Sequence, residues 1–238
     1  MALRRKWKSG DPCLVHHVDP SIVVVEKRAG ILTQATEKNE RNTLIHHVRR
    51  FLRGRGSTEI FPVHRLDRVV SGLLVYARRP DAQAALIEQF KVHDVQRLYT
   101  AAVHGVLDAD EGTFDSWLVT NHRSLRVFSG EEGQRGTRHA VTHWRVRERF
   151  ADATLVEVAL ETGIRNQIRV HFAEAGHPLL GERKYAEDPG LQKTHRIFLH
   201  AEFLGFDHPY TGRYVRYEAP LPPDLEKWKK KLGPHRDV

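Results

Sequence analysis

The feature that most constrains the fold of this chain is a series of short, β-branched apolar segments separated at irregular intervals by amphipathic ones. Residues 22–27 (IVVVEK) and 73–77 (LLVYA) have the length and composition of buried strands. Residues 153–160 (ATLVEVAL) alternate as a half-buried strand does, and Ser71-Gly72 is expected as a turn. Further strands are expected at 97–105, 140–150, 196–206 and 213–219.

Helical periodicity occurs in four places between these strands. Residues 42–53 carry Leu44, Val48 and Leu52 at i, i+4 and i+8, with Asn42 as the expected N-cap. The other expected helices are 80–92, opened by Pro80, then 164–176, ended by Gly176, and the basic closing segment 222–232. Strands form the majority and the order is not a strict βαβ alternation. The pattern therefore predicts an α+β fold with a mixed, largely antiparallel sheet and flanking helices.

Composition indicates the class of protein, one with a buried core, and the kind of partner that its charge favours. The chain has 238 residues, of which 40% are hydrophobic and 29% charged, enough to bury a core as one large domain or one domain with small appendages. The formal net charge of +8 favours a polyanionic partner, nucleic acid first and an acidic membrane surface second.

Neither cysteine usage nor apolar runs indicate an exported or membrane protein. Cys13 is the single cysteine, so no internal disulfide can form. No apolar run approaches the roughly 18 residues needed to span a bilayer. The start, MALRRKWKSGDP, is basic but lacks the apolar core of a secretory signal, and we expect a soluble, cytoplasmic protein.

The first candidate site is the segment HRLDR, which precedes the LLVYA strand. It places one carboxylate, Asp67, beside His64, Arg65 and Arg68. This arrangement is either a structural Asp–Arg ion pair or part of a functional site. The second interpretation is favoured by ETGIRNQIRVH, in which Arg165 and Arg169 would lie one turn apart on one helix face. An arginine there can hold a carboxylate by two hydrogen bonds, and a fixed, partly desolvated carboxylate is a nucleophile or base.

Tyr99 is the second candidate. It alternates with Ala101 and Val103 along one face of its strand. It is either a core aromatic or a flat ring offered to a nucleobase.

Other kinds of catalytic site are not indicated. The chain has 16 histidines, and the pairs His16-His17 and His46-His47 are adjacent, a poor geometry for binding one ion. Neither a zinc-protease helix motif nor a CxxC is present, so no metal site is expected. A phosphate-binding GxxxxGKS loop and a GxSxG nucleophile elbow are also missing.

Five blocks of the sequence together resemble the RluA-type pseudouridine synthases. They are VVVEKRAGILTQ, HRLDRVVSGLLVYA, RLYTAAVHG, ETGIRNQIRVHFAEAGHPLLGERKY and FLHAEFLGFDHPYTGRYVRYEAPLPPDL, in the family's order, from about residue 18 to about residue 226. The resemblance implies the pseudouridine synthase fold, a mixed, largely antiparallel sheet split by a central cleft. It also implies isomerisation of uridine to pseudouridine within RNA, without a cofactor.

The same resemblance assigns roles to four residues. Asp67 is expected to be the catalytic carboxylate, and Arg169 the group that orients it. Tyr99 is expected to stack on the base and to help transfer the C5 proton. Arg65 is expected to fill the gap left when the target base is flipped out. Because flipping a base costs least outside a regular helix, the expected substrate is a stem-loop or irregular region of rRNA or tRNA.

The resemblance also leads to an expected domain organisation, with residues 1–17 a basic N-terminal extension and residues 18–238 the catalytic domain. No separate N-terminal RNA-binding domain is expected, and a monomer is the default. Target selection would then rest on this domain. The basic segments 121–139 and 227–231 are candidates, although a solvated hairpin at 121–139 without an RNA role is an equal alternative.

Four positions depart from the family pattern and leave the choice of uridine open. They are Ala29, Val70, Arg97 and Ile164. Two readings from other classes also remain. One is a catalytically silent RNA-binding or ribosome-assembly protein on the same fold, and the other is a metal-dependent nuclease, which would need clustered carboxylates.

Overall fold

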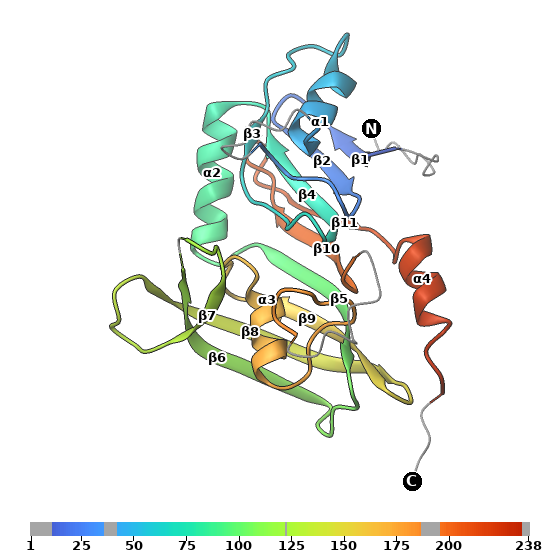
Figure 1. Ribbon diagram of the computed structural model, residues 1–238. Coiled ribbons are helices and arrows are strands. Elements are labelled where there is room, and N and C mark those ends of the chain that lie inside the picture. The colour runs from blue at the N-terminus through green and yellow to red at the C-terminus, as the bar shows by residue number, and fades with distance from the viewer. Residues whose placement is uncertain (1–10, 36–41, 122, 187–195, 235–238) are drawn as a thin grey trace. The chain divides into compact units, whose positions relative to one another are not determined.

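The computed structural model describes residues 11–35, 42–121, 123–186 and 196–234 (Figure 1). The chain forms two compact units. The first comprises Met1–Arg97 with Ala201–Pro220, and the second comprises Leu98–His200 with Leu221–Val238. The chain passes from one unit to the other within strand β5 (Gln96–His104), within strand β10 (Leu199–Asp207) and again between Pro220 and Leu221.

The first unit is built on strands in the order β1-β2-β4-β10. Strands β1 (Cys13–Val18), β2 (Ile22–Lys27) and β4 (Ser71–Ala77) are antiparallel neighbours, β3 (Phe61–Pro62) pairs with β4, and β11 (Tyr214–Glu218) pairs with β10. The strands predicted at 22–27 and 73–77 are confirmed. Every residue of β2 and β4 is buried, which explains why their apolar residues form continuous runs, 22–25 and 73–77, rather than alternating with polar ones.

Two helices pack in this unit. Helix α1 (Leu44–Leu52) contacts β1 and buries the predicted Leu44, Val48 and Leu52. Helix α2 (Pro80–Lys91) begins at Pro80, as predicted, and contacts β3 and β4. The predicted N-cap of α1 is wrong, because Thr43 occupies that position. The Asn42 side chain instead lies 2.6 Å from Nε2 of His47.

The turn predicted at Ser71-Gly72 is also wrong, because both residues belong to β4. Gly72 has φ of +122°, a conformation that favours glycine. A Cβ at Gly72 would lie 2.2 Å from the carbonyl oxygen of Ala201 in β10. Glycine at this position therefore allows strand β10 to approach closely. Local turn preferences do not predict this packing requirement.

The second unit has the strand order β5-β9-β8-β6-β7, and all these neighbours are antiparallel. Strands β8 (Thr137–Arg149) and β9 (Ala153–Leu160) confirm two predicted segments. Strand β6 (Glu111–Thr120) was not predicted, because its charged residues obscure the apolar alternation. The segment 121–139 contains strand β7 (Val127–Gly130), which pairs with β6, and the first residues of β8.

Helices α3 (Gln167–Glu174) and α4 (Pro223–Lys229) complete this unit. Helix α3 contacts β7 and β8, and α4 buries Leu225 in a cluster with Phe198 and Leu155. Helix α3 begins three residues later than predicted, because Asn166 at its N-cap is left-handed with φ of 57°. Arg165 therefore precedes the helix, and the prediction that Arg165 and Arg169 share one helix face is wrong.

The predicted boundary between residues 17 and 18 falls inside β1, since Cys13–Val18 pairs along β2 and belongs to the same sheet. Residues 1–10 of the predicted extension lie outside the described residues. No helix within the described ranges is long and apolar enough to cross a membrane, and those ranges contain no group of three or more potential metal ligands.

Candidate active site

Asp67 and Arg65 lie in the first unit, in the segment between β3 and β4. Asp67 is half-buried and Arg65 is exposed. The backbone on either side of Asp67 is hydrogen-bonded to residues at the end of β2 and in the loop that follows it. The position of the segment is therefore fixed by contacts with a distant part of the chain. The carbonyl oxygen of Asp67 also accepts a hydrogen bond of 3.1 Å from the amide of Val70.

Lys27, the last residue of β2, forms the central tie. Its side chain has no accessible surface, and Nζ lies 2.6 Å from the carbonyl oxygen of Val70 and 3.4 Å from that of Arg68. Nζ also lies 2.9 Å from the carbonyl oxygens of both Arg28 and Ile31. Burying an ammonium group costs free energy unless acceptors surround it, and these four carbonyls supply that compensation. One buried cation thus joins the chain after β2 to the residues that follow Asp67.

Thr33 and Gly30 tie the same two segments. The Thr33 hydroxyl donates to the carbonyl oxygen of Leu66 at 2.8 Å and accepts from its amide at 3.2 Å. The amide of Gly30 donates to the carbonyl oxygen of Arg68 at 2.6 Å, and Nε of Arg68 donates back to Gly30 at 3.0 Å. Both neighbours of Asp67 are therefore fixed, which restricts where its carboxylate can point.

His64 is a structural group and not one of the cations around Asp67. Its Nε2 accepts a hydrogen bond of 3.1 Å from the amide of Val75, and its ring stacks on Phe90 with centroids 4.6 Å apart. Burial, with a smaller contribution from the charge of Arg97, lowers the pKa of His64 to about 3. The imidazole is therefore neutral near pH 7 and anchors the HRLD segment to β4.

Tyr99 and Arg169 lie in the second unit. Tyr99 is in β5 opposite Val158 of β9 and is 7% exposed, so most of its surface is already packed. Ala101 and Val103 follow it on the same face, as predicted, and both are fully buried.

Arg169 binds a carboxylate with two parallel hydrogen bonds, but the partner seen in this unit is Glu182. Nε of Arg169 lies 2.7 Å from Oε2 of Glu182, and Nη2 lies 2.8 Å from Oε1. Nη1 donates to Oδ1 of Asn166 at 3.0 Å, and the guanidinium lies 5.4 Å from the centre of the Tyr185 ring. Burial alone would raise the pKa of Glu182, but the hydrogen bonds and charge of Arg169 outweigh it and lower that pKa.

Glu182 is the residue that the sequence interpretation missed. It lies in the GERKY end of the block ETGIRNQIRVHFAEAGHPLLGERKY. It is separated from Arg169 by 13 positions, and neither a helical nor a strand period relates the two residues. An isolated glutamate between glycine and arginine would ordinarily be a surface residue.

The start of α3 is fixed by polar side chains. Oε1 of Gln167 accepts from the Thr162 hydroxyl and the Ile164 amide, while Nε2 donates to the carbonyl oxygen of Val141. His171, one turn later, lies between the hydroxyls of Thr142 and Ser116 at 2.9 and 3.1 Å. Burial is the main cause that lowers its pKa to about 4. This network sets the position from which Arg169 projects.

Comparisons with known proteins give one consistent result. Residues 21–174 match the model of the family described as RNA pseudouridylate synthase. An uncharacterized RNA pseudouridine synthase of Bacillus subtilis, YlyB, is 38% identical over 215 residues, covering 89% of this chain and 70% of that protein. The ribosomal large subunit pseudouridine synthase D of Xanthomonas campestris is 36% identical over 233 residues, covering 91% and 68%.

Solved structures show the same fold. Human RNA pseudouridylate synthase domain containing 4 has a TM-score of 0.72 at 22% identity, covering 88% of this chain and 89% of that chain. Human RNA pseudouridylate synthase domain containing 1 has the same TM-score and identity and covers 98% and 100%. The predicted mixed, largely antiparallel α+β architecture is confirmed.

Proposed function

The chain belongs to the RNA pseudouridylate synthase family and isomerises uridine to pseudouridine in RNA, and we propose that Asp67 is the carboxylate that starts this reaction. The observation that supports this assignment is the tethering of the HRLD segment. Four side chains or backbone groups outside it, those of Lys27, Gly30, Thr33 and Val75, bond to residues on both sides of Asp67. A carboxylate that must attack one atom of a bound nucleotide needs such a fixed backbone.

The reaction requires no change in oxidation state. The N1–C1′ glycosidic bond breaks, the uracil turns, and a bond forms between C5 and C1′. C5 then loses its proton and N1 gains one, so the composition of the nucleotide is unchanged. An ionised Asp67 serves this sequence either by adding to C1′ or by removing a neighbouring ribose proton. In both routes the carboxylate must be ionised.

The other three residues receive supporting roles in this proposal. Arg169 keeps Asp67 ionised and aligned. Tyr99 stacks on the target base and assists the loss of the C5 proton. Arg65, exposed on the HRLD segment, fills the space that the flipped base leaves.

The proposed substrate is a stem-loop or irregular region of large-subunit rRNA, modified in the cytoplasm. The name of the Xanthomonas relative supports rRNA as the first candidate, and tRNA is the alternative that the test must include. A net charge of +8 gives affinity for any phosphate backbone, so selection of one uridine must come from the shape of the RNA and from base contacts.

Deletion and complementation test these assignments together. Pseudouridines are mapped across rRNA and tRNA by carbodiimide treatment and sequencing in a strain that lacks the gene. The strain is then restored with wild type, Asp67→Asn or the exposed control Asp108→Asn. A site lost on deletion should return with wild type and with the control, and it should not return with Asp67→Asn.

Purified protein separates the alternatives. Asp67→Asn should bind the transcript that contains the mapped site as wild type does, yet form no pseudouridine. Formation at the wild-type rate would remove Asp67 from the mechanism. Rescue of a growth defect by Asp67→Asn would favour a role in ribosome assembly, and cleavage that depends on magnesium would favour a nuclease.

A further inference from the structure

The surface at the C-terminal end of α1 carries a concentration of positive charge that the proposed reaction does not use. Residues 42–58 include four arginines and two histidines, and no aspartate or glutamate. The four arginines are exposed and are called here the α1 arginine cluster: Arg49, Arg50, Arg53 and Arg55.

No cluster arginine forms an ion pair with a carboxylate in the described part of the chain, although Asp11 and Arg50 line the same cleft. Other exposed cations in the same protein are paired, such as Arg79 with Asp81 at 2.7 Å and Arg145 with Glu111 at 3.2 Å. Within the described ranges, none of the four cluster guanidinium groups lies at ion-pair distance from a carboxylate. The pKa of the adjacent His47 is lowered, by burial first and then by the charges of His46 and Arg50.

The helix dipole accounts for only part of the cluster. Arg49 and Arg50 lie in the last turn of α1, where a cation stabilises the helix. Arg53 is the C-cap, and Arg55 lies beyond it in the RGRGS loop. Four like charges close together repel one another, which costs electrostatic free energy. At Arg53 and Arg55 the helix dipole gives no compensating benefit. A polyanionic partner would reduce this repulsion.

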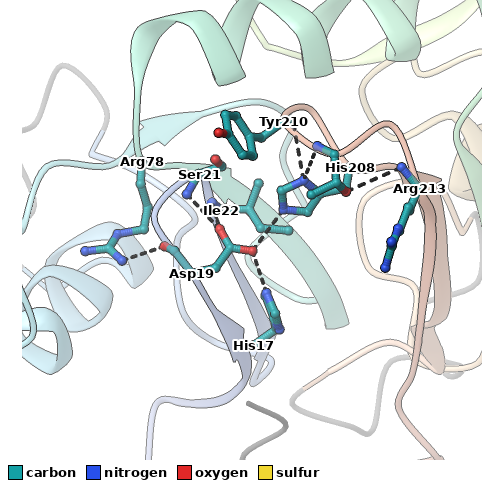
Figure 2. A network of polar contacts seen from close by, with 9 residues as sticks. His17, Asp19, Ser21, Ile22, Arg78, His208, Tyr210 and Arg213 are labelled. Atoms are coloured by element: carbon teal, nitrogen blue, oxygen red, sulfur yellow. Dashed lines mark hydrogen bonds and ion pairs between the residues drawn. The ribbon is translucent and has the colours of Figure 1, made fainter.

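The loop that carries Arg53 and Arg55 is held in place. Nη1 of Arg55 donates to the carbonyl oxygen of Phe51 at 2.7 Å, and its guanidinium lies 4.6 Å from the centre of the Phe51 ring. Arg78 donates through Nη2 to the carbonyl oxygen of Ser57 at 2.8 Å and through Nη1 to that of Asp19 at 2.6 Å. Figure 2 shows Arg78 reaching the Asp19 carbonyl. The cluster therefore sits on a fixed support, which lowers the entropic cost of binding.

A cleft of about 390 Å³ lies beside the cluster and shares one residue, Arg50, with it. Pro12, Leu14, Val15 and Phe51 form apolar walls, and the remaining lining residues are Asp11, Cys13, His47 and Arg50. This volume lies within the range of small-ligand sites. An apolar and aromatic wall next to guanidinium groups suits an unstacked base whose phosphate remains outside.

The cluster is near the candidate active site within the first unit. The amide of Leu44, at the start of α1, donates to the carbonyl oxygen of Leu32, and the next residue, Thr33, is bonded to Leu66 of the HRLD segment. A helix of nine residues spans about 13 Å. The arginines at its far end are thus about one helix length from the segment that carries Asp67.

We propose that the α1 arginine cluster binds the phosphate backbone of single-stranded RNA flanking the target uridine, with one of its bases entering the adjacent cleft. This inference rests on the RNA substrate of the family, and it adds a contact surface outside the four proposed site residues. A membrane surface is less suitable, because the exposed large apolar residues in the described part of the chain are Val92, Leu125, Phe128, Tyr210 and Tyr214, and none of these lies on α1.

Charge removal with a matched control tests the proposal. The variant R49Q/R50Q/R53Q and the control K91Q/R145Q/R213Q each lower the net charge by three, and all six positions are exposed. Affinity for a fluorescein-labelled single-stranded RNA is measured over a series of KCl concentrations. A third variant, R49K/R50K/R53K, keeps the charge, and thermal unfolding confirms that each variant is folded.

The cluster variant should lower the slope of log Kd against log salt by about 2, because each neutralised phosphate contributes about 0.7 for single strands. The control and the Lys variant should keep the wild-type slope. With RNA that carries the mapped uridine, the cluster variant should raise KM and leave kcat unchanged, whereas Asp67→Asn should abolish kcat and keep binding. The experiment can therefore contradict the role of Asp67 without contradicting the role of the α1 arginine cluster, and the reverse.

Three results would overturn the inference. One is an equal slope for the cluster variant and wild type. Another is an equal loss in the control, which would make the effect one of net charge alone. The third is unchanged RNA binding together with lost binding to phosphatidylglycerol vesicles, which would assign the surface to a membrane.

Discussion

Arg169 and Glu182 form a buried, two-pronged ion pair in which Nε lies 2.7 Å from Oε2 and Nη2 lies 2.8 Å from Oε1. The two side chains are 10% and 0% exposed. Oε1 also accepts from the amide of Lys184 at 2.8 Å, so the carboxylate is fixed by backbone as well as by the guanidinium. Glu182 thereby determines the plane and position of Arg169.

Replacing Glu182 by glutamine should therefore destabilise the fold strongly. The amide would leave Arg169 buried without a counter-charge, and breaking such a pair costs about 3–5 kcal/mol. Urea denaturation measures the change in the free energy of unfolding. Glu88→Gln is the matched control, because Glu88 pairs with Lys91 on the surface and is 62% exposed. A loss of the same small size in both variants would contradict the importance of the buried pair.

Lys27→Met should both destabilise the protein and reduce catalysis. The substitution leaves four buried carbonyl oxygens without the ammonium that bonds them, and the expected loss of unfolding free energy is at least about 3 kcal/mol. Since two of those carbonyls belong to Arg68 and Val70, which follow Asp67 closely, kcat should fall even at temperatures where the variant remains folded. Urea denaturation and pseudouridine formation check both effects. Lys91→Met, at an exposed position, should change neither; normal kcat in folded Lys27→Met would disprove the positioning role.

Gly72→Ala should be much more harmful than alanine at another glycine with positive φ. A Cβ at Gly72 would meet backbone atoms of Ala201 at 2.2 to 2.7 Å, and neither strand can shift without breaking its pairing. We expect a loss of about 3 kcal/mol or more in unfolding free energy. Gly133 has φ of +75° and nothing within 4 Å of the added carbon, so Gly133→Ala should cost only about 1 kcal/mol. Similar melting temperatures for the two variants would contradict the steric argument.

Two histidines with lowered pKa values, His64 and His171, predict a loss of stability as the pH falls. Burial lowers the pKa of His64 to about 3 and that of His171 to about 4, while an unfolded histidine titrates near 6.5. Between these values the unfolded chain binds protons that the folded chain does not, so the free energy of unfolding decreases as pH falls from about 6.5.

A substitution identifies the group responsible. His171→Gln should be less stable at pH 7 but should lose less additional stability between pH 7 and pH 5, because one fewer proton is taken up on unfolding. Urea denaturation at the two pH values measures the difference, above the range in which carboxylates titrate. The exposed His46→Gln is the control and should follow wild type. A pH dependence in His171→Gln as steep as that of wild type would rule out this origin.

Local patterns predicted several elements well. The strand at 22–27 and the buried positions Leu44, Val48 and Leu52 agree with the structure, because runs of β-branched residues and a spacing of four residues have strong conformational preferences. The start of α3 failed for the opposite reason. Asn166 adopts a left-handed conformation and bonds to Arg169 and Tyr185, and those contacts override the helical pattern that includes Arg165.

Some features of the candidate site could likewise be predicted from the sequence, and others could not. The motifs HRLD, RLY and QIR pointed to Asp67, Tyr99 and Arg169 through family resemblance, and their assigned roles remain predictions. The neutral state of His64 and the Glu182 partner of Arg169 could not be predicted, because both depend on burial and on partners far away in the chain.

The amino-acid sequence by itself determined the class of fold, the faces of most strands and helices, and the family to which the chain belongs, since periodicity and motif order are local properties. The tertiary structure alone decided what holds the key side chains. Lys27 reaches Val70 across 43 positions, Thr33 reaches Leu66 across 33, and Gly72 makes room for Ala201. Such contacts depend on which segments meet when the apolar faces are buried together, and no short-range pattern encodes that meeting.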